Sequence, residues 1–390
     1  MEKSIKDFLE SHEFTYLKIE NSAHITLIYN LYCHDIDRID DLKISSGIIY
    51  LYYGVYFKIK KDYDQMKKYY LMAIEKCYPE AMHNLGFYYD EIEKDYDQMK
   101  KYYLMAIKKG HLGAMYNLGF YYKCIEEDYD QMKKYYLMAI KKGYTEAMYS
   151  LGFYYDEIEK DYDQMKKYYL MAIKKGHVES MYNLGIYYED IEKDYNQMKK
   201  YYLMAIEKGH IEAMYCLGFY YQNIEKDYNQ TKKYYLMAIE KGHIEAMYNL
   251  GFHYKCIEED YDQMEKYYLM AIEKGHIKAI SKLEKYYQQT NNTLDLLKLY
   301  IKIGDMSKLS NLLIDYSNQT TFNEEINIIL LEYFNNIDEK NLPVIFKICK
   351  QLLNKQVDLL ETHFKYTENG LGFGEAKKDF YQQISLFNNI

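Results

Sequence analysis

The sequence predicts an all-α protein built as a right-handed α-solenoid of about seven to eight 33-residue helix-turn-helix repeats with helical caps. The first observation is a block, DYDQMKKYYLMAI, that recurs with small changes every 33 residues. Its copies begin at Asp62, Asp95, Asp128, Asp161, Asp194, Asp227 and Asp260. A fixed period of this length is typical of solenoids, whose units are too small to bury their own apolar faces and stack on their neighbours. The second observation is that apolar residues return every three or four positions, without the alternation that predicts strands.

One helix of the unit at 95–127 is predicted to begin at Asp95. Asp95 and Gln98 have the spacing of a capping box, with a short acceptor at the N-cap and an amide three residues later. The residues that follow place an apolar stripe on one side and lysines on the other. The stripe is Tyr96, Met99, Tyr102, Tyr103, Ala106 and Ile107, and the lysines are Lys100, Lys101, Lys108 and Lys109. Gly110 then stands where a left-handed C-cap favours glycine.

The other helix of the unit carries Ala114, Leu118 and Tyr122 at a spacing of four. Gly119 follows Leu118 and would remove a side chain where the two helices approach closely. A glycine inside a helix costs about 1 kcal/mol relative to alanine, so its return in other units indicates a packing role. The equivalent residues are Gly86, Gly152, Gly185, Gly218 and Gly251.

Three segments are expected along the chain. Residues 1–45 are predicted to form a helical N-terminal cap, residues 46–289 the repeat solenoid, and residues 290–390 a helical C-terminal extension. The terminal units depart from the repeat: the first has LYYG at 51–54, and the last has Leu283 and Glu284 in place of Leu-Gly. Atypical ends are what capping repeats need, because each has one face without a neighbour.

Composition restricts the classes of partner. The net charge is −9 and Arg38 is the only arginine, whereas nucleic-acid binders usually carry Arg-rich basic clusters, so we expect no nucleic-acid partner. No stretch reaches about 18 apolar residues and the N-terminus lacks an apolar segment, so we expect a cytoplasmic protein without a signal peptide or membrane contact. The six cysteines form no CxxC pair, and Cys124 and Cys256 share a repeat position four units apart, so free thiols are expected.

The order of residues in the unit resembles the Sel-1-like repeat, a relative of the tetratricopeptide repeat. It is carried by Leu118, Gly119, Tyr122, Asp128, Met132, Tyr135, Tyr136, Ala139, Gly143 and Ala147. Ankyrin repeats share the period of 33, but their TPLH signature is absent. Tyr135 stands at the Trp position of the family, and the turn between the helices is shorter and lacks the two glycines of the family.

The resemblance covers about 240 residues and implies an adaptor or scaffold role in protein complexes. The uniform repeats and the richness in Tyr, Asn, Ile and Lys are also similar to such proteins of large amoeba-infecting DNA viruses.

The resemblance further implies that the first helix of each pair lines a concave face. One position of this helix carries tyrosine, and the position one turn earlier carries glutamate. The tyrosine row is Tyr116, Tyr149, Tyr182, Tyr215 and Tyr248, with His83 at its start, and the glutamate row is Glu146, Glu179, Glu212 and Glu245, with Glu80 at its start. Asp90, Asp156 and Glu189 lie at the far end of the helices. Tyrosine offers a rigid ring and a hydroxyl for an extended peptide; the alternative is that these rings pack in the core.

We therefore expect a non-enzymatic protein–protein interaction module that binds a protein or peptide in a concave groove lined by tyrosines and acids. A carbohydrate-binding solenoid that stacks sugars on the tyrosines is the alternative. An enzyme with its site in residues 290–390 is disfavoured, because that segment lacks a constellation of His, Asp, Glu and Cys. No catalytic residue and no cofactor is expected.

A histidine follows the helix-ending glycine in five units, and this pattern could suggest a metal site. The residues are His111, His177, His210, His243 and His276. A metal needs ligands about 2 Å from one point, whereas packed neighbouring helices lie about 10 Å apart. The histidines are therefore predicted to serve the turn and the packing, and no metal is expected.

Overall fold

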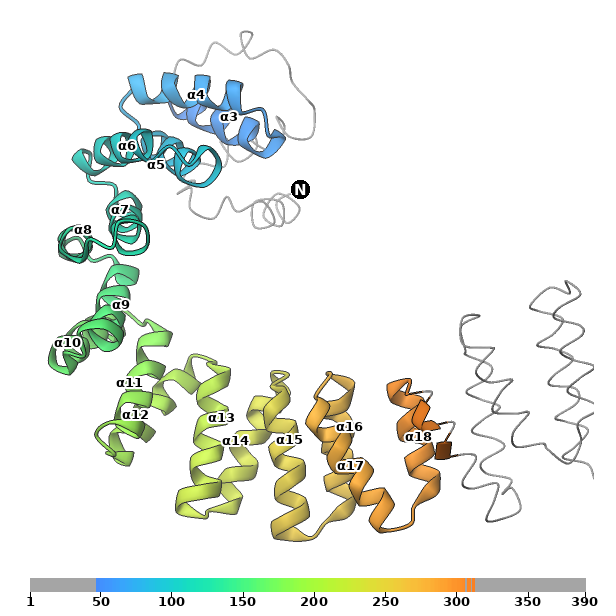
Figure 1. The fold of residues 1–390 in the computed structure, drawn as a ribbon. Coiled ribbons are helices and arrows are strands. Elements are labelled where there is room, and N and C mark those ends of the chain that lie inside the picture. Colours follow the sequence, from blue (N-terminus) through green and yellow to red (C-terminus); the bar gives the residue numbers. More distant parts are fainter. Residues whose placement is uncertain (1–46, 306, 310, 313–390) are drawn as a thin grey trace, which may run out of the picture. The chain divides into compact units, whose positions relative to one another are not determined.

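A computed structural model describes residues 47–305, 307–309 and 311–312 of the chain. In this part of the chain helices follow one another in pairs and no strand occurs, which confirms the predicted class of an all-α repeat solenoid. The chain divides into two compact units, residues 1–210 and residues 211–390. Helix pairs of both units are coloured along the chain in Figure 1.

In the first unit each first helix packs against the second helix that follows it. The first helices are α3 (Gly47–Lys60), α5 (Pro79–Tyr88), α7 (Leu112–Cys124), α9 (Thr145–Tyr154) and α11 (Val178–Asp190). The second helices are α4 (Tyr63–Glu75), α6 (Tyr96–Lys108), α8 (Tyr129–Lys141), α10 (Tyr162–Ile173) and α12 (Tyr195–Glu207).

The second unit continues the same pairing. Its helices are α13 (Ile211–Tyr220), α14 (Tyr228–Glu240), α15 (Ile244–His253), α16 (Tyr261–Glu273), α17 (Ile277–Gln289) and α18 (Thr293–Ile303). Helices α17 and α18 pack together beyond the last copy of the recurring block. Residues 1–45 and most of 290–390 lie outside the described residues, so the division into three segments stays a prediction.

The two helices of a pair meet at the interior glycine. A Cβ atom added at Gly185 would lie 2.5 Å from the ring of Tyr202, and one added at Gly119 would lie 2.7 Å from the ring of Tyr136. Both rings are fully buried. Only a residue without a side chain allows this approach, which confirms the packing role predicted for these glycines.

The second helices begin as the sequence predicts, with one difference. Asp95 Oδ1 accepts the backbone N–H of Gln98 at 3.1 Å. The reciprocal half of the capping box is not formed, because the N–H of Asp95 donates instead to the carbonyl oxygen of Tyr89 at 3.0 Å. At the other end Gly110 has a φ of 87°, which confirms its left-handed C-cap.

The turn inside a pair is a widened helical turn in four of the described pairs. There a π-helix follows the first helix: η2 (Tyr89–Glu93), η3 (Tyr155–Glu159), η4 (Tyr221–Glu225) and η5 (Tyr254–Glu258). The residue after η2 is Lys94, with a φ of 55°, in the left-handed region that few non-glycine residues adopt. The wide turn and this single left-handed residue bring the chain to the next N-cap without the two glycines of the Sel-1-like pattern.

The described cysteines form no disulfide, and Cys77, Cys124 and Cys256 are free thiols, as predicted. Cys33 and Cys349 lie outside the described residues. Among the described helices, none has the length and apolar character needed to cross a membrane.

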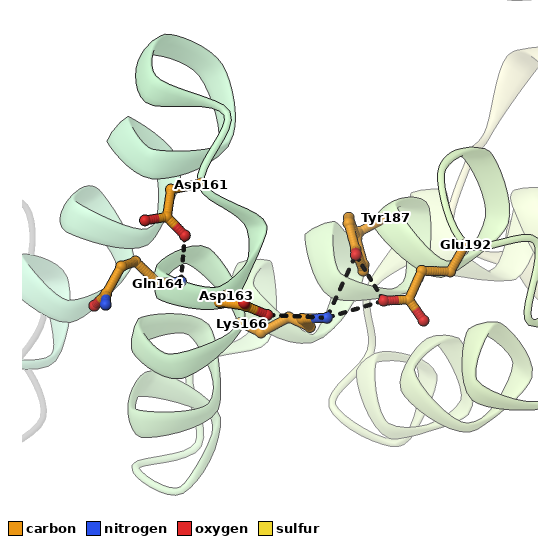
Figure 2. A network of polar contacts seen from close by, with 6 residues as sticks. All are labelled: Asp161, Asp163, Gln164, Lys166, Tyr187 and Glu192. Atoms are coloured by element: carbon orange, nitrogen blue, oxygen red, sulfur yellow. Dashed lines mark hydrogen bonds and ion pairs between the residues drawn. The ribbon is translucent and has the colours of Figure 1, made fainter.

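A polar clasp joins the second helix of one pair to the end of the next first helix. Figure 2 shows Lys166 Nζ 2.9 Å from Glu192 Oε1, to which the hydroxyl of Tyr187 donates at 2.7 Å. Burial and the bond to Glu192 raise the pKa of Tyr187 to about 12. The clasp returns with the same spacing in other pairs, as Lys67–Glu93, Lys100–Glu126, Lys133–Glu159 and Lys232–Glu258.

Removing the clasp is expected to have a modest effect on stability. Lys166→Met should lower the free energy of unfolding by about 0.5–1 kcal/mol, because both charged groups keep contact with water, which screens the pair. Lys167→Met is the matched control, since Lys167 contacts the amide oxygen of Gln164 and the ring of Tyr168 within its own helix and should change stability less. Urea unfolding measures both variants, and equal losses would contradict a special role for the clasp.

Candidate functional site

The predicted tyrosines of the first helices are half-buried, and hydrogen bonds tie the hydroxyls of Tyr116 and Tyr215 to the neighbouring repeat. The hydroxyl of Tyr116 lies 3.2 Å from Ser150 Oγ. In the second unit, Asn249 Nδ2 donates to the hydroxyl oxygen of Tyr215 at 3.0 Å. Burial raises the pKa of Tyr215. These phenols therefore link successive repeats, and their hydroxyls are engaged inside the protein.

Four of the five tyrosine rings also stack on a histidine that begins the next first helix. The ring centroids lie 4.4–4.7 Å apart. The pairs are Tyr149–His177, Tyr182–His210, Tyr215–His243 and Tyr248–His276. The tyrosines are thus part of the packing between repeats while they keep partial contact with solvent.

The histidines cap the helices that they precede. Nδ1 of His243 accepts the N–H of Ala246 at 3.0 Å, and Nε2 lies 3.2 Å from Glu212 Oε1. Because Nδ1 accepts, the neutral ring carries its proton on Nε2 and donates it to the carboxylate. The same contacts recur at His276, with Ala279 and Glu245. This confirms the predicted role in the turn and the packing, and it engages two glutamates of the predicted row.

An exposed row of phenylalanines lies beside the tyrosines, and the sequence reasoning did not single it out. Phe120 follows Tyr116 by one helical turn, and their ring centroids are 6.5 Å apart. The most exposed members are Phe87 (36%), Phe120 (49%), Phe219 (45%) and Phe252 (39%). Within each unit, we call the surface formed by the tyrosine, glutamate and phenylalanine positions the first-helix face. The available signal for this row was a phenylalanine four residues after Tyr116, Tyr149, Tyr215 and Tyr248.

Half-buried carboxylates lie at the far end of the same helices. The hydroxyl of Tyr169 donates to Asp156 Oδ2 at 3.5 Å, and that of Tyr202 donates to Glu189 Oε2 at 2.5 Å. Burial raises the pKa of both carboxyl groups. Asp90 holds the equivalent position in η2, directly after α5, and burial also raises its pKa. Within the described residues, neither a hydrogen bond nor an ion pair reaches the Asp90 carboxylate.

The fold and the repeated contacts define a solenoid of stacked helix pairs with one aromatic and acidic face per unit. The Sel1 repeat matches seven stretches of the sequence: residues 47–76, 79–111, 112–144, 145–177, 178–210, 211–243 and 244–276. These stretches make up more than half of the chain, which therefore belongs to the Sel1 repeat family. The predicted family is thereby confirmed.

The chain is also similar to solved structures, and the first of those that follow supports the solenoid fold. A protective antigen of uropathogenic Escherichia coli strains with an SLR fold is 20% identical, with a TM-score of 0.52, over 87% of this chain and 83% of the antigen. A Sel1 repeat protein from Oxalobacter formigenes is 23% identical, with a TM-score of 0.44, over 59% of this chain and 97% of that protein. An immunity protein of Pseudomonas aeruginosa is 21% identical, with a TM-score of 0.32, over 45% and 73%. Among curated proteins there is no significant match.

Proposed function

We propose that this protein is a non-enzymatic scaffold that binds a protein or peptide on its first-helix face. Sel1 repeat solenoids are generally protein-interaction scaffolds. The observation that carries the proposal is the row of exposed phenylalanines, because aromatic side chains are enriched where proteins meet and their apolar area favours binding when it leaves water.

The frame around these rings supports the proposal. The phenols, the histidine caps and the interior glycines fix each first helix against its neighbours. A surface that is held in place before binding loses little conformational freedom when a partner docks. The tyrosine and glutamate positions named above remain the proposed partner-binding residues, now with Phe87 and Phe120 beside them.

The alternative of a carbohydrate ligand receives less support from the same contacts. Stacking on a sugar requires an open aromatic face, whereas the ring of Tyr149 lies against both His177 and Tyr169. A cytoplasmic location and a source among large DNA viruses remain predictions from the sequence.

A peptide selection with the full chain tests the proposal. Phages that display random short peptides are selected on the natural protein, and the affinities of the selected peptides are then measured for the double variant Phe87→Asn, Phe120→Asn. We expect this variant to bind at least about ten-fold more weakly, because aromatic anchors carry much of the binding energy of an interface. Its melting temperature should stay close to that of the natural chain, since both rings are exposed.

The matched control is the double variant Leu104→Asn, Leu137→Asn. These leucines lie on the second helices α6 and α8 and are exposed to a similar degree, 39% and 37%. Peptides should bind this variant as tightly as the natural chain. Equal loss in both double variants, or a loss only in the leucine variant, would contradict a binding site on the first-helix face.

A further inference from the structure

Two lysines of the chain already occupy phenylalanines of the first-helix face. Lys58 Nζ lies 5.2 Å from the ring centroid of Phe87, and Lys123 Nζ lies 5.2 Å from that of Phe153. An ammonium group at this distance from a ring is attracted by the negative face of the π system. The face therefore binds cations on its phenylalanines within this molecule.

These lysines share one position of the repeat. Lys58 follows Gly54 by four residues, and Lys123 follows Gly119 by four residues. Both glycines pack on the tyrosine of their second helix. A lysine at this position thus reaches a phenylalanine of the next repeat. That phenylalanine directly follows the packing glycine of its own helix.

The repeat between them carries an acid at this same position, as do the repeats with Asp156 and Glu189. Four residues after the packing glycine Gly86 stands Asp90, a carboxylate in place of an ammonium group. The phenylalanine of the next repeat is Phe120, whose ring is 49% exposed. In the part of the chain that the structure describes, no lysine lies over Phe120. The chain thus offers a carboxylate at the repeat position from which Lys58 and Lys123 reach the next phenylalanine.

We propose that Phe120 and Asp90 form a receptor for a lysine or arginine side chain of the partner. This inference rests on the proposed function and adds the chemistry of the partner to it. The ring of Phe120 would bind the cation of the partner as Phe87 and Phe153 bind Lys58 and Lys123. The carboxylate of Asp90 would form an ion pair with that same cation.

The charges of the surroundings favour the same class of partner. Asp90 is half-buried and lacks a hydrogen-bonding or ion-pairing partner in the described residues, and a partly desolvated carboxylate gains most from a cation. In the first unit, the acids on and beside this face outnumber the two lysines that lie over its phenylalanines, Lys58 and Lys123. These acids are Glu80, Asp90, Glu146, Asp156, Glu179 and Glu189. An acidic peptide would meet repulsion here, and an apolar one would leave the Asp90 carboxylate without a partner.

The test begins with the peptides selected on the full chain. We expect each to contain a lysine or arginine whose replacement by norleucine, which keeps the length of the lysine side chain and removes its charge, weakens binding about ten-fold. Binding should also weaken as the salt concentration rises, because added ions screen the charge pair. Peptides that depend on Phe120 yet bind equally well with norleucine would overturn the receptor and leave the proposed function standing.

The variant Asp90→Lys supplies the receptor with an internal lysine. Lysine occurs naturally at this position in other repeats, at Lys58, Lys123 and Lys255, so the fold should tolerate it, which thermal melting verifies. Binding of the lysine peptides should fall about ten-fold. The control Asp97→Lys makes the same change of net charge on a side chain of α6 that is 97% exposed, and it should leave binding nearly unchanged.

A charge exchange provides the second measurement. The double variant Asp90→Lys, Lys123→Asp keeps the net charge of the natural chain and moves the open receptor from Phe120 to Phe153. We expect it to recover binding of the lysine peptides. Unchanged binding in Asp90→Lys, or an equal loss in Asp97→Lys, would overturn the receptor. Failure of the proposed function gives a different result, since then no selected peptide depends on Phe87 and Phe120.

Discussion

Gly185→Leu is expected to lower the free energy of unfolding by about 3 kcal/mol, at the upper end of the range for overpacked cores. The first atom of the new side chain would lie 2.5 Å from two carbon atoms of the Tyr202 ring. That ring is fully buried, and its hydroxyl donates to Glu189, so it has little room to move. Gly185→Ala adds the same first atom and should cost about 2 kcal/mol. Urea unfolding of the full chain measures both changes.

Two controls separate overpacking from a general effect of leucine. Asp190→Leu places the same side chain at an exposed position of α11 and should change stability by less than about 0.5 kcal/mol. Combining Gly185→Leu with Tyr202→Ala removes the ring that the leucine would strike, so the two losses should be less than additive. An unchanged unfolding midpoint for Gly185→Leu would show that α11 and α12 do not meet as described.

Acid is expected to destabilise the repeat that contains His83. Burial first, and then the nearby His111 and Lys58, lower the pKa of this imidazole to about 3. Its Nε2 lies 3.1 Å from Asn117 Nδ2, a contact that suits a neutral ring. Since the pKa in the unfolded chain is about 6.5, the folded state resists protonation. The contribution of the neutral imidazole to stability is therefore fully present above about pH 6.5 and is lost as the pH falls toward 3. Between pH 7 and pH 4 the free energy of unfolding should fall by about 3 kcal/mol.

His83→Tyr is the matched variant, because tyrosine stands at this position in the five repeats that follow. It should remove the titration and reduce the difference in stability between the two pH values by about 3 kcal/mol. Urea unfolding at both values measures the difference, and hydrogen exchange of residues 79–111 shows where it arises. Carboxyl groups elsewhere titrate in both proteins and cancel in the comparison. Equal acid sensitivity of the variant and the natural chain would contradict the role of His83.

Much of the helical framework could be predicted because its determinants are local. Asp95 as an N-cap, Gly110 as a left-handed C-cap and the apolar stripe between them all act within one or two helical turns. The interior glycine was also informative, since its cost inside a helix must be offset by a close contact. Period, capping and composition were therefore enough for the fold class and the helix pairing.

The detail of the candidate site depended on contacts between repeats, which the sequence does not show. The bond from Tyr116 to Ser150 spans 34 residues, and that from Lys166 to Glu192 spans 26. Tyrosines chosen as ligand contacts therefore prove to be engaged with neighbouring repeats. The exposed phenylalanines stood out only once their burial was known. The π-helical turn was also beyond prediction, because it places a lysine or a glutamate in a backbone conformation that usually favours glycine.

The constant spacing of these bonds has a consequence for how such a chain changes in evolution. Each clasp spans 26 residues, and the bond from each N-cap histidine to a glutamate, at His210, His243 and His276, spans 31. Unequal crossover between nearly identical coding repeats removes or duplicates a whole period, and the joined helices then find the same partners as before. The contacts between repeats do not depend on the number of copies. The order of Lys and Asp along the first-helix face does depend on it. Gain or loss of a repeat therefore rewrites the charge pattern offered to a partner while every structural bond is kept.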